Sequence, residues 1–297
     1  MKNVIEERKI CKICDQKLIF FGPKDNYCYF ICKDCLSIQL NPMPLADELE
    51  KLYKESYMKE NAREVITSTE DWYKESYTYN IAILNSIKQF TSLNTNDLIL
   101  DFGAGYGYLA DLLNKNGFNC IGLELSKERL QYCAMNNKTN IEKGGIKDLT
   151  RYKNKISVIV MCAVFEHLSN QEEFMEIVVS TLKQNGYFIT LHPTSKIYEL
   201  ISKVIRFGNT KKELPYLQGA FAPPWHVAFI SIKGMKILAK KTDFEIVKIL
   251  PAPQGRMKGL TGLIQIILET TNKIGWFFFK EKWPLVTSHI FVMKKIN

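Results

Sequence analysis

Histidine is scarce in this sequence, and long apolar runs are missing from it. Only four of the 297 residues are histidine, so few side chains can gain or lose a proton near neutral pH. No apolar stretch reaches the roughly 18 residues that a membrane-spanning helix needs. The N-terminal stretch "MKNVIEERKI" carries too many charges to be typical of a signal peptide. We therefore expect a soluble chain that works in the cytoplasm.

Acidic residues are sparse in the last third of the chain. Residues 196–297 contain 17 Lys or Arg against 6 Asp or Glu, and the whole chain has a net charge of +9. This balance favours an acidic partner, such as a phosphorylated small molecule, a nucleic acid or a membrane surface. Scattered lysines are also common on an ordinary solvated surface, and both interpretations stay open at this point.

Half of the eight cysteines form two similar C-x-x-C pairs. The pairs are "CKIC" and "CKDC", and 17 residues separate them. Two such pairs at this spacing are typical of a structural zinc site, in which four thiolates surround Zn²⁺ and leave no open coordination position. We predict a zinc ribbon over residues 1–42 that stabilises a small segment rather than reading nucleic acid. Its predicted ligands are Cys11, Cys14, Cys32 and Cys35.

A glycine-rich loop follows an apolar stretch in "LILDFGAGYGYLADLL", residues 98–113. The pattern predicts a buried strand, a tight turn and a helix, which together form a nucleotide-binding arrangement. The dinucleotide fingerprint needs a glycine at position 108, where this chain has Tyr108. Asp101, just before the glycines, would repel a pyrophosphate but suits a cationic ligand with an α-amino group. S-adenosylmethionine carries both a sulfonium and an ammonium group.

The next predicted strand supports a nucleoside ligand. It lies in "FNCIGLELS", residues 118–126, and ends at Glu124. A carboxylate at this place in a doubly wound fold can accept both ribose hydroxyls. The alternative is a cluster that caps the following helix, which Ser126 opens.

These motifs resemble the class I S-adenosylmethionine-dependent methyltransferases, over roughly residues 90–297. The segment "GGIKDL" resembles the part that lines the adenine, and "ISVIVMCAVFEHL" resembles the fourth strand and its turn. The resemblance implies an α/β fold with a doubly wound, seven-stranded Rossmann-like sheet over residues 93–297, after a helical linker or cap at 43–92. It also implies these cofactor-binding residues: Asp101, Gly103, Ala104, Gly105, Gly107, Glu124, Leu125, Asp148 and Cys162.

The histidines follow the predicted strands on the side where ligands bind in such sheets. His226 lies in "FAPPWHVAFI", His167 in "EHL" and His192 in "ITLHP", whereas His289 lies inside the last predicted strand. Methyl transfer to a hydroxyl benefits from a base, and a positioned base contributes about 10²–10⁴ in rate. We predict His226 as the general base and His167 as the second candidate. A structural role in an apolar loop is the alternative for each.

A hydrophobic insertion is expected at residues 252–284, between the last two strands. Its apolar and aromatic residues are flanked by lysines, and the segment is longer than an ordinary connection. Residues 260–283 could form a lid, a dimer face or an interfacial helix that contacts a membrane surface. The last possibility would make the protein peripheral to the inner membrane face. Coverage of a sheet edge is the simpler alternative.

A zinc ribbon before this fold resembles bacterial sugar and surface-polysaccharide methyltransferases. O-methylation of a sugar or another glycan-pathway small molecule is therefore the leading prediction. An RNA methyltransferase is the alternative that the basic charge favours, although the ribbon lacks a basic run with interleaved aromatics and the chain lacks an N/D-P-P-[YF] motif. C-methylation of a nucleotide-linked sugar and a non-enzymatic scaffold rank lower.

Overall fold

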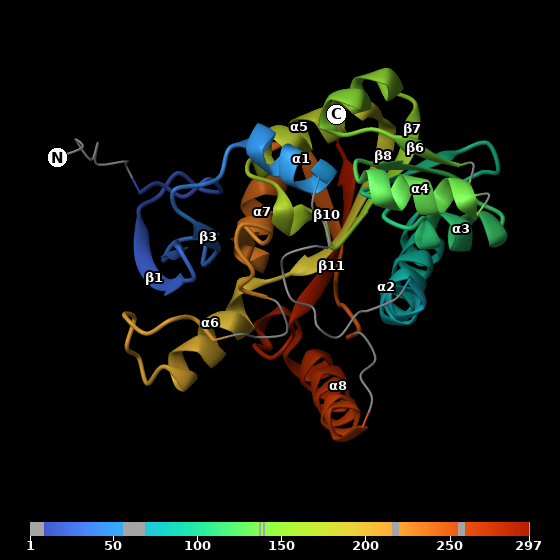
Figure 1. Cartoon of the computed structure of the whole chain (residues 1–297). Helices are drawn as coiled ribbons and strands as arrows, with labels where there is room; N and C mark the ends of the chain where they lie inside the picture. Colours follow the sequence, from blue (N-terminus) through green and yellow to red (C-terminus); the bar gives the residue numbers. More distant parts are fainter. Residues whose placement is uncertain are drawn as a thin grey trace.

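The computed structural model describes residues 9–55, 69–136, 138, 140–215, 220–254 and 259–296 (Figure 1). Parts of the predicted segments 43–92 and 252–284 lie outside the described residues. Among the described residues, no helix is both long and apolar enough to cross a membrane.

A seven-stranded sheet forms the centre of the molecule. Its order is β10-β11-β8-β7-β4-β5-β6. The neighbours from β8 to β6 are all parallel, and β11 is antiparallel to both of its neighbours. The predicted doubly wound seven-stranded sheet is thereby confirmed. Its strands are β4 (Leu98–Phe102), β5 (Asn119–Glu124), β6 (Ile141–Lys143), β7 (Ile156–Cys162), β8 (Leu182–Pro193), β10 (Phe244–Pro251) and β11 (Ser288–Lys295).

Alternating strand residues face two separate hydrophobic layers. Ile99 packs with α2 (Thr69–Phe90) and α3 (Tyr108–Lys115), whereas its neighbour Leu100 packs with α5 (Gln171–Thr181) and α7 (Ile232–Lys241). Both residues are fully buried, as the period-two geometry of a strand requires when helices cover both faces. Helix α4 (Lys127–Met135) follows β5, and η1 (Ile146–Tyr152) follows β6. Helix α2 thus lies in the helical layer that covers the Ile99 face of the sheet.

The N-terminal segment forms a second, four-stranded sheet. Three of its strands come from the predicted ribbon: β1 (Leu18–Lys24), β2 (Tyr27–Cys32) and β3 (Ile38–Leu40). The fourth is β9 (Ala228–Phe229), from the segment that contains His226, and Ile38 pairs with Phe229. Its apolar side chains join the same core as one face of the large sheet. The ribbon is thus built partly from residues far beyond the predicted range 1–42.

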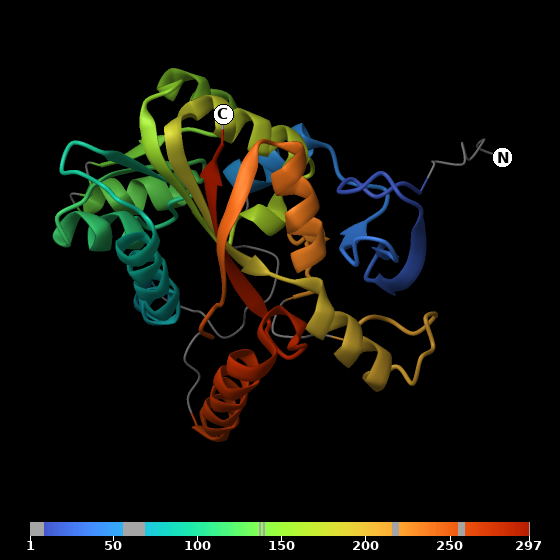
Figure 2. The ribbon, with the colours of Figure 1, turned by 180° about the vertical axis from the view of Figure 1, so that it is seen from behind.

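The remaining elements lie at the ends of the strands. Helix α1 (Ala46–Glu55) follows the ribbon, and η2 (Phe165–His167) follows β7. Helix α6 (Ser195–Ile205) begins where β8 ends, and α8 (Gly259–Phe279) with η3 (Lys280–Lys282) connects β10 to β11. In Figure 1 and in the reverse view of Figure 2, α6 and α8 project at the same lower end of the molecule.

Candidate active site

The glycine loop turns sharply between β4 and α3. Its glycines have φ angles of 77°, 58° and 72°, a region that residues with a Cβ rarely adopt. At Gly103 an added Cβ would also lie 2.6 Å from Val164 Cγ2. The amides of Gly103 and Ala104 donate to the carbonyl of Leu123, each at 2.9 Å. The glycines at 103, 105 and 107 are therefore required by the backbone path itself.

Glu124 connects this loop to the next strand. One carboxylate oxygen accepts a hydrogen bond from the Gly105 amide at 2.7 Å, and the other accepts from the amides of Leu125 and Ser126 at 2.8 Å. Arg129 Nη1 lies 3.8 Å from the first oxygen. A carboxylate has about four lone-pair sites, so these bonds fix the group without using its full accepting capacity. The side chain lies at the strand end where a ribose was expected.

Asp101 is a buried acid between two neighbouring strand ends. Burial, together with the charge of Glu124, raises the pKa of its carboxyl to about 7. Its Oδ2 atom is buried and has no hydrogen-bond partner among the described residues. A buried carboxylate in this state is stabilised by a positive charge. The site therefore fits a cationic ligand, as S-adenosylmethionine is.

Three further predicted cofactor residues surround the same strand ends. Gly145 packs on Leu125, because an added Cβ would lie 3.1 Å from Leu125 Cδ2. Asp148 Oδ2 accepts from the Gly145 amide at 2.8 Å, so this acid also shapes its own turn. Cys162 ends β7, and burial together with the charge of Asp101 raises its thiol pKa. The structure thus brings all of the predicted cofactor residues to the ends of β4, β5, β6 and β7.

His167 and His226 lie together at the same edge of the sheet. Their ring centroids are 4.9 Å apart. His167 Nδ1 donates to the carbonyl of Trp225, and His226 Nδ1 donates to the carbonyl of Ala220, both at 2.7 Å. A carbonyl can only accept, so each Nδ1 carries a hydrogen, and in the neutral ring the lone pair is on Nε2. The buried Glu166 completes a group whose nearest side-chain N and O atoms all lie within 4.8 Å of one another.

The family model of the methyltransferase domain matches residues 74–249 of the chain. The chain belongs to this methyltransferase family. The match covers the glycine loop, both strand-end acids and the histidine pair. The predicted class of S-adenosylmethionine-dependent methyltransferases is thereby confirmed.

Curated relatives of this methyltransferase match it over the central part of the chain. A ubiquinone biosynthesis O-methyltransferase of Rickettsia bellii (strain OSU 85-389) is 34% identical over 128 residues, which are 39% of this chain and 53% of the relative. One of Pelagibacter ubique (strain HTCC1062) is 28% identical over 131 residues, which are 42% and 53% of the two chains. The chain spans about half the length of these relatives. Neither name supports the predicted resemblance to sugar and polysaccharide methyltransferases.

Solved structures share the fold at low sequence identity. A chain of the Haloferax volcanii complex between a methyltransferase activator and a methyltransferase aligns with a TM-score of 0.55 at 12% identity, over 86% of this chain and 100% of that one. A protein described as an S-adenosylmethionine-dependent methyltransferase from Listeria monocytogenes aligns with a TM-score of 0.51 at 12% identity, over 74% and 100%. Both show the fold alone.

Two aromatic residues that the sequence did not single out contact the histidine pair or its neighbours. Tyr53 of α1 packs edge-on against Trp225 at 5.1 Å and against His167 at 5.5 Å between ring centroids. The hydroxyl of Tyr29, in β2, donates to the backbone carbonyl of His226 at 2.7 Å. Tyr29 is fully buried, and it lies 197 residues from His226 in the chain. No local pattern in the sequence could have revealed either contact.

The other two histidines lie in the core. His192 of β8 and His289 of β11 are paired across the sheet. Their Nδ1 atoms contact the hydroxyls of Thr190 at 3.2 Å and Thr194 at 2.8 Å. Burial lowers the pKa of both rings to about 3. Burial and these contacts give His192 and His289 a structural role in the core.

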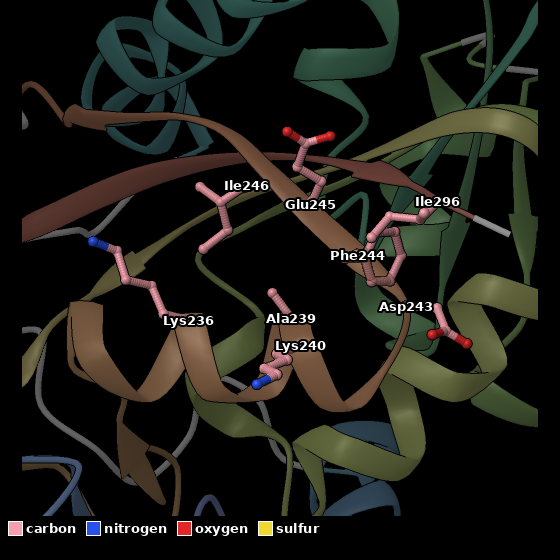
Figure 3. Close-up of a pocket in the computed structure, with 8 residues that line it drawn as sticks. All are labelled: Lys236, Ala239, Lys240, Asp243, Phe244, Glu245, Ile246 and Ile296. Atoms are coloured by element: carbon pink, nitrogen blue, oxygen red, sulfur yellow. The ribbon is translucent and has the colours of Figure 1, made fainter.

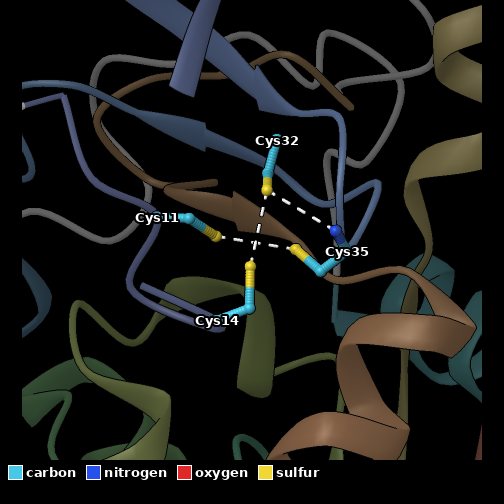
Figure 4. A group of neighbouring side chains, drawn as sticks. All are labelled: Cys11, Cys14, Cys32 and Cys35. Carbon is cyan, nitrogen blue, oxygen red and sulfur yellow. Dashed lines mark hydrogen bonds between the residues drawn. The ribbon is translucent and has the colours of Figure 1, made fainter. Parts of the chain in front are cut away.

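The four predicted zinc ligands converge at the base of the ribbon (Figure 4). Cys11 Sγ lies 3.5 Å from Cys35 Sγ, and Cys14 Sγ lies 3.4 Å from Cys32 Sγ. All four sulfurs fall within 4.8 Å of one another. A tetrahedral ion with bonds of about 2.3 Å to sulfur separates its ligands by roughly 3.8 Å. The donor set and spacing therefore fit Zn²⁺.

A shallow hollow of about 350 Å³ lies between α7 and β10 (Figure 3). Its lining includes Phe244, at the start of β10, and Ile296, just beyond the end of the antiparallel β11. Both positions lie at the edge of the sheet opposite to the glycine loop. This hollow is therefore separate from the candidate active site.

Proposed function

We propose that the protein transfers a methyl group from S-adenosylmethionine to a hydroxyl of a small-molecule acceptor, with His226 as the general base. One observation carries the proposal: two histidines are fixed side by side at the strand ends that also hold the glycine loop and Asp101. Both rings are oriented by backbone carbonyls, so the Nε2 atom of each is the one that can accept a proton.

The cofactor side consists of groups with separate tasks. Asp101 offsets the positive charge of the ligand, and the backbone of Gly103 and Gly105 allows a close approach. Glu124 would accept a ribose hydroxyl through Oε2, since its Oε1 already accepts from two amides. Asp148 would hold the adenine, and Leu125 and Cys162 would line the nucleoside. When bound, S-adenosylmethionine supplies an electrophilic methyl group on its sulfonium.

The acceptor side excludes water and takes up a proton. Tyr53 packs on both His167 and Trp225, so aromatic surface lies beside the histidine pair. Trp225 is 9% exposed, so its ring is itself held in the core. His226 Nε2 takes the proton of the acceptor hydroxyl as the new bond to carbon forms, and His167 positions the acceptor or its neighbouring ring. Methyl transfer needs this alignment more than it needs added reactivity.

The names of the curated relatives favour an oxygen acceptor, since both are O-methyltransferases of ubiquinone biosynthesis. We therefore propose two candidate small-molecule acceptors for the methyl group. One is a hydroxyl on a quinone-pathway molecule, and the other is the glycan-pathway hydroxyl that the ribbon favoured. An RNA acceptor is the alternative class, because the last third of the chain is strongly basic. The two classes differ in salt dependence, since contacts to phosphates release counterions.

The test combines cofactor titration with an acceptor panel. S-adenosylmethionine should bind with measurable heat, and a panel of hydroxylated quinone precursors, nucleotide-linked sugars and structured RNA should identify the methylated product by mass. His226→Asn should lower kcat by about 10²–10⁴ while the Kd of the cofactor stays within about threefold of the wild-type value. His289→Asn serves as the matched control for replacing a histidine remote from the loop.

Three results would overturn parts of this proposal. Turnover of His226→Asn near the wild-type rate would remove His226 as the base. Loss of wild-type activity on chelation with EDTA while the ribbon keeps its zinc, restored by a divalent ion, would instead give the group of Glu166, His167 and His226 a metal-binding role. No binding of S-adenosylmethionine at all would remove the enzymatic function.

We also propose that the four ribbon cysteines hold one structural Zn²⁺. The four sulfurs converge in space, which supports binding of the metal. Four thiolates also fill all coordination positions of a tetrahedral Zn²⁺, which is typical of a structural site. Metal analysis of the purified chain should give about one zinc per chain.

A further inference from the structure

Helix α8 turns an apolar side away from the rest of the protein. Six of its large side chains are each 57–69% exposed: Ile266, Ile267, Ile274, Phe277, Phe278 and Phe279. At about 100° per residue the first five occupy one face of the helix, roughly 120° wide, and Phe279 lies outside this face, stacked on Trp283. Such a face is normally buried against a core. Here it is the surface that the molecule presents.

The opposite side of α8 is fixed to the body of the protein. An added Cβ at Gly275 would lie 2.1 Å from the ring of Trp283, so the two are in close contact. The indole of Trp283 donates to Asn272 at 2.8 Å, and Trp276 packs on His289 with centroids 5.3 Å apart. These contacts hold the helix in one orientation, with its apolar face outward.

Helix α6 adds a second apolar projection. Val204 is 65% exposed and Phe207, just beyond the helix, is 90% exposed. Both projections lie at the same end of the molecule in Figures 1 and 2. The Nζ atom of Lys196 donates to the carbonyl of Lys282 at 2.9 Å, which joins the start of α6 to the turn after α8.

The topology directs both projections to the edge of the sheet that carries the candidate active site. Helix α6 begins immediately after the carboxyl end of β8. The connection from α8 enters β11, which is antiparallel to β8, so it arrives at the same edge. A surface that contacts α6 and α8 would therefore lie on the side of the strand ends.

Lysines accompany the apolar groups on both projections. Lys273 and Lys280 lie on and beside α8, and Lys280 Nζ is 5.3 Å from the ring centroid of Phe277. Lys211 and Lys212 are exposed next to Phe207, and Lys212 Nζ is 5.8 Å from its ring centroid. Exposed phenylalanines bordered by lysines are the composition of helices that lie in the interface of an anionic membrane.

We propose that the apolar faces of α8 and α6 dock the protein on the surface of a bilayer rich in anionic lipids. The phenylalanines and isoleucines enter the boundary between headgroups and acyl chains, and the lysines contact the headgroup charges. This orientation places the strand-end edge towards the bilayer. The proposal rests on the surface and topology of the chain and is independent of the proposed methyl transfer.

The test measures binding of the full-length chain to vesicles without any acceptor. The protein should sediment with vesicles of phosphatidylcholine and 40 mol% phosphatidylglycerol, and this binding should weaken as salt is raised. Its affinity for vesicles of pure phosphatidylcholine should be at least tenfold lower. The double variant Phe277→Ser, Phe278→Ser should lose at least tenfold in affinity. The double variant Val204→Ser, Phe207→Ser should lose affinity as well.

A matched control comes from a different part of the surface. Met135, the last residue of α4, is 76% exposed, and Met135→Ser should bind vesicles like the wild type. Cofactor affinity should be unchanged in every variant, because none of these positions lies in the glycine loop. The proposal is overturned if the wild type does not bind the anionic vesicles or if the α8 variant binds them equally well. A dimer interface on α8 would also overturn the proposal. In that case sedimentation velocity would show a wild-type dimer that does not bind vesicles, and the α8 variant would be a monomer.

Discussion

Replacing Asp101 with asparagine should stabilise the cofactor-free protein and weaken its binding of S-adenosylmethionine. Burial and the nearby charge of Glu124 raise the pKa of the Asp101 carboxyl from 3.8 to about 7. Above pH 7 the folded chain therefore holds an ionised carboxylate at a cost of about 4 kcal/mol relative to the unfolded chain. Asparagine has nearly the same shape without the charge, so the variant avoids this cost.

The pH dependence isolates this electrostatic effect. An acid whose pKa is raised on folding holds its proton more tightly in the folded state, so its contribution to stability falls as pH rises from about 4 to about 7. The free energy of unfolding of Asp101→Asn, minus that of the wild type, should grow by about 3 kcal/mol between pH 5 and pH 8. Effects of the amide that do not depend on pH cancel in this comparison.

Urea unfolding at the two pH values measures stability, and calorimetric titration measures cofactor binding. The wild type should bind S-adenosylmethionine about tenfold more weakly at pH 6 than at pH 8, because the proton on Asp101 must leave first. The variant should bind more weakly at both values, without that pH dependence. Equal stability differences at pH 5 and pH 8, or undiminished cofactor affinity in the variant, would refute the reasoning.

Asp97, just before the same strand, provides the control. Hydrogen bonds from Ser157 and from the Asn94 amide lower the pKa of its carboxyl. Its contribution to stability is therefore present above its ordinary pKa and is lost as pH falls. Asp97→Asn should destabilise the protein at pH 8, the opposite sign to Asp101→Asn, and leave cofactor affinity unchanged.

The remaining predictions concern the ribbon and the buried histidines. Tyr29→Phe removes the hydrogen bond to the carbonyl of His226 and should lower the free energy of unfolding in urea by about 1 kcal/mol. In turnover assays its kcat should fall by a larger factor than the KM for the acceptor changes. Because burial lowers the pKa of His192 and His289 to about 3, stability should be complete above about pH 6.5 and fall below it by about 1.4 kcal/mol per histidine and pH unit. His192→Gln should halve that slope in urea titrations, and an unchanged slope would contradict the assignment. Cys14→Ser should lower the zinc content and speed hydrogen exchange in β9, while the Kd of S-adenosylmethionine changes less than threefold; slow exchange in β9 without zinc would show that the ribbon does not need the metal.

The cofactor side could be predicted from the sequence because its geometry is local. Gly103, Gly105 and Gly107 adopt positive φ angles over five residues, and Asp101 stands next to them in the chain. The central strands β4 and β7 were also recognisable, since both faces of the sheet are buried there and both strands are nearly continuous in apolar residues. The edge strand β6 has only three residues, two of them charged and exposed, and gave no such signal. The raised pKa of Asp101 could not be predicted. It depends on how deeply the folded chain buries this carboxyl, and the sequence shows only that the residue is an acid.

The acceptor side was predictable only in part. His226 and His167 were selected by their order after strands, but their mutual contact depends on how the residues just before β9 are placed. The ribbon was recognised by its cysteines, whereas its role in holding that loop depends on pairing between Ile38 and Phe229. Tyr29 and Tyr53 contribute through contacts to residues more than a hundred positions away, and such contacts leave no periodic signal.

The two halves of the site are consequently supported by different parts of the chain. The glycine loop is held by β4, β5 and α3, which are neighbours in sequence. The loop of His226 is held by the ribbon at three points: the Tyr29 hydroxyl, the β3–β9 pairing and the hydrogen bond from the Ser231 hydroxyl to the Cys35 carbonyl. A histidine that accepts a proton must be fixed within a fraction of an ångström of its acceptor, and a flexible loop of prolines and aromatics alone would not fix it. The ribbon therefore holds the loop of His226, and under the proposed mechanism it would contribute to acceptor geometry without touching the acceptor.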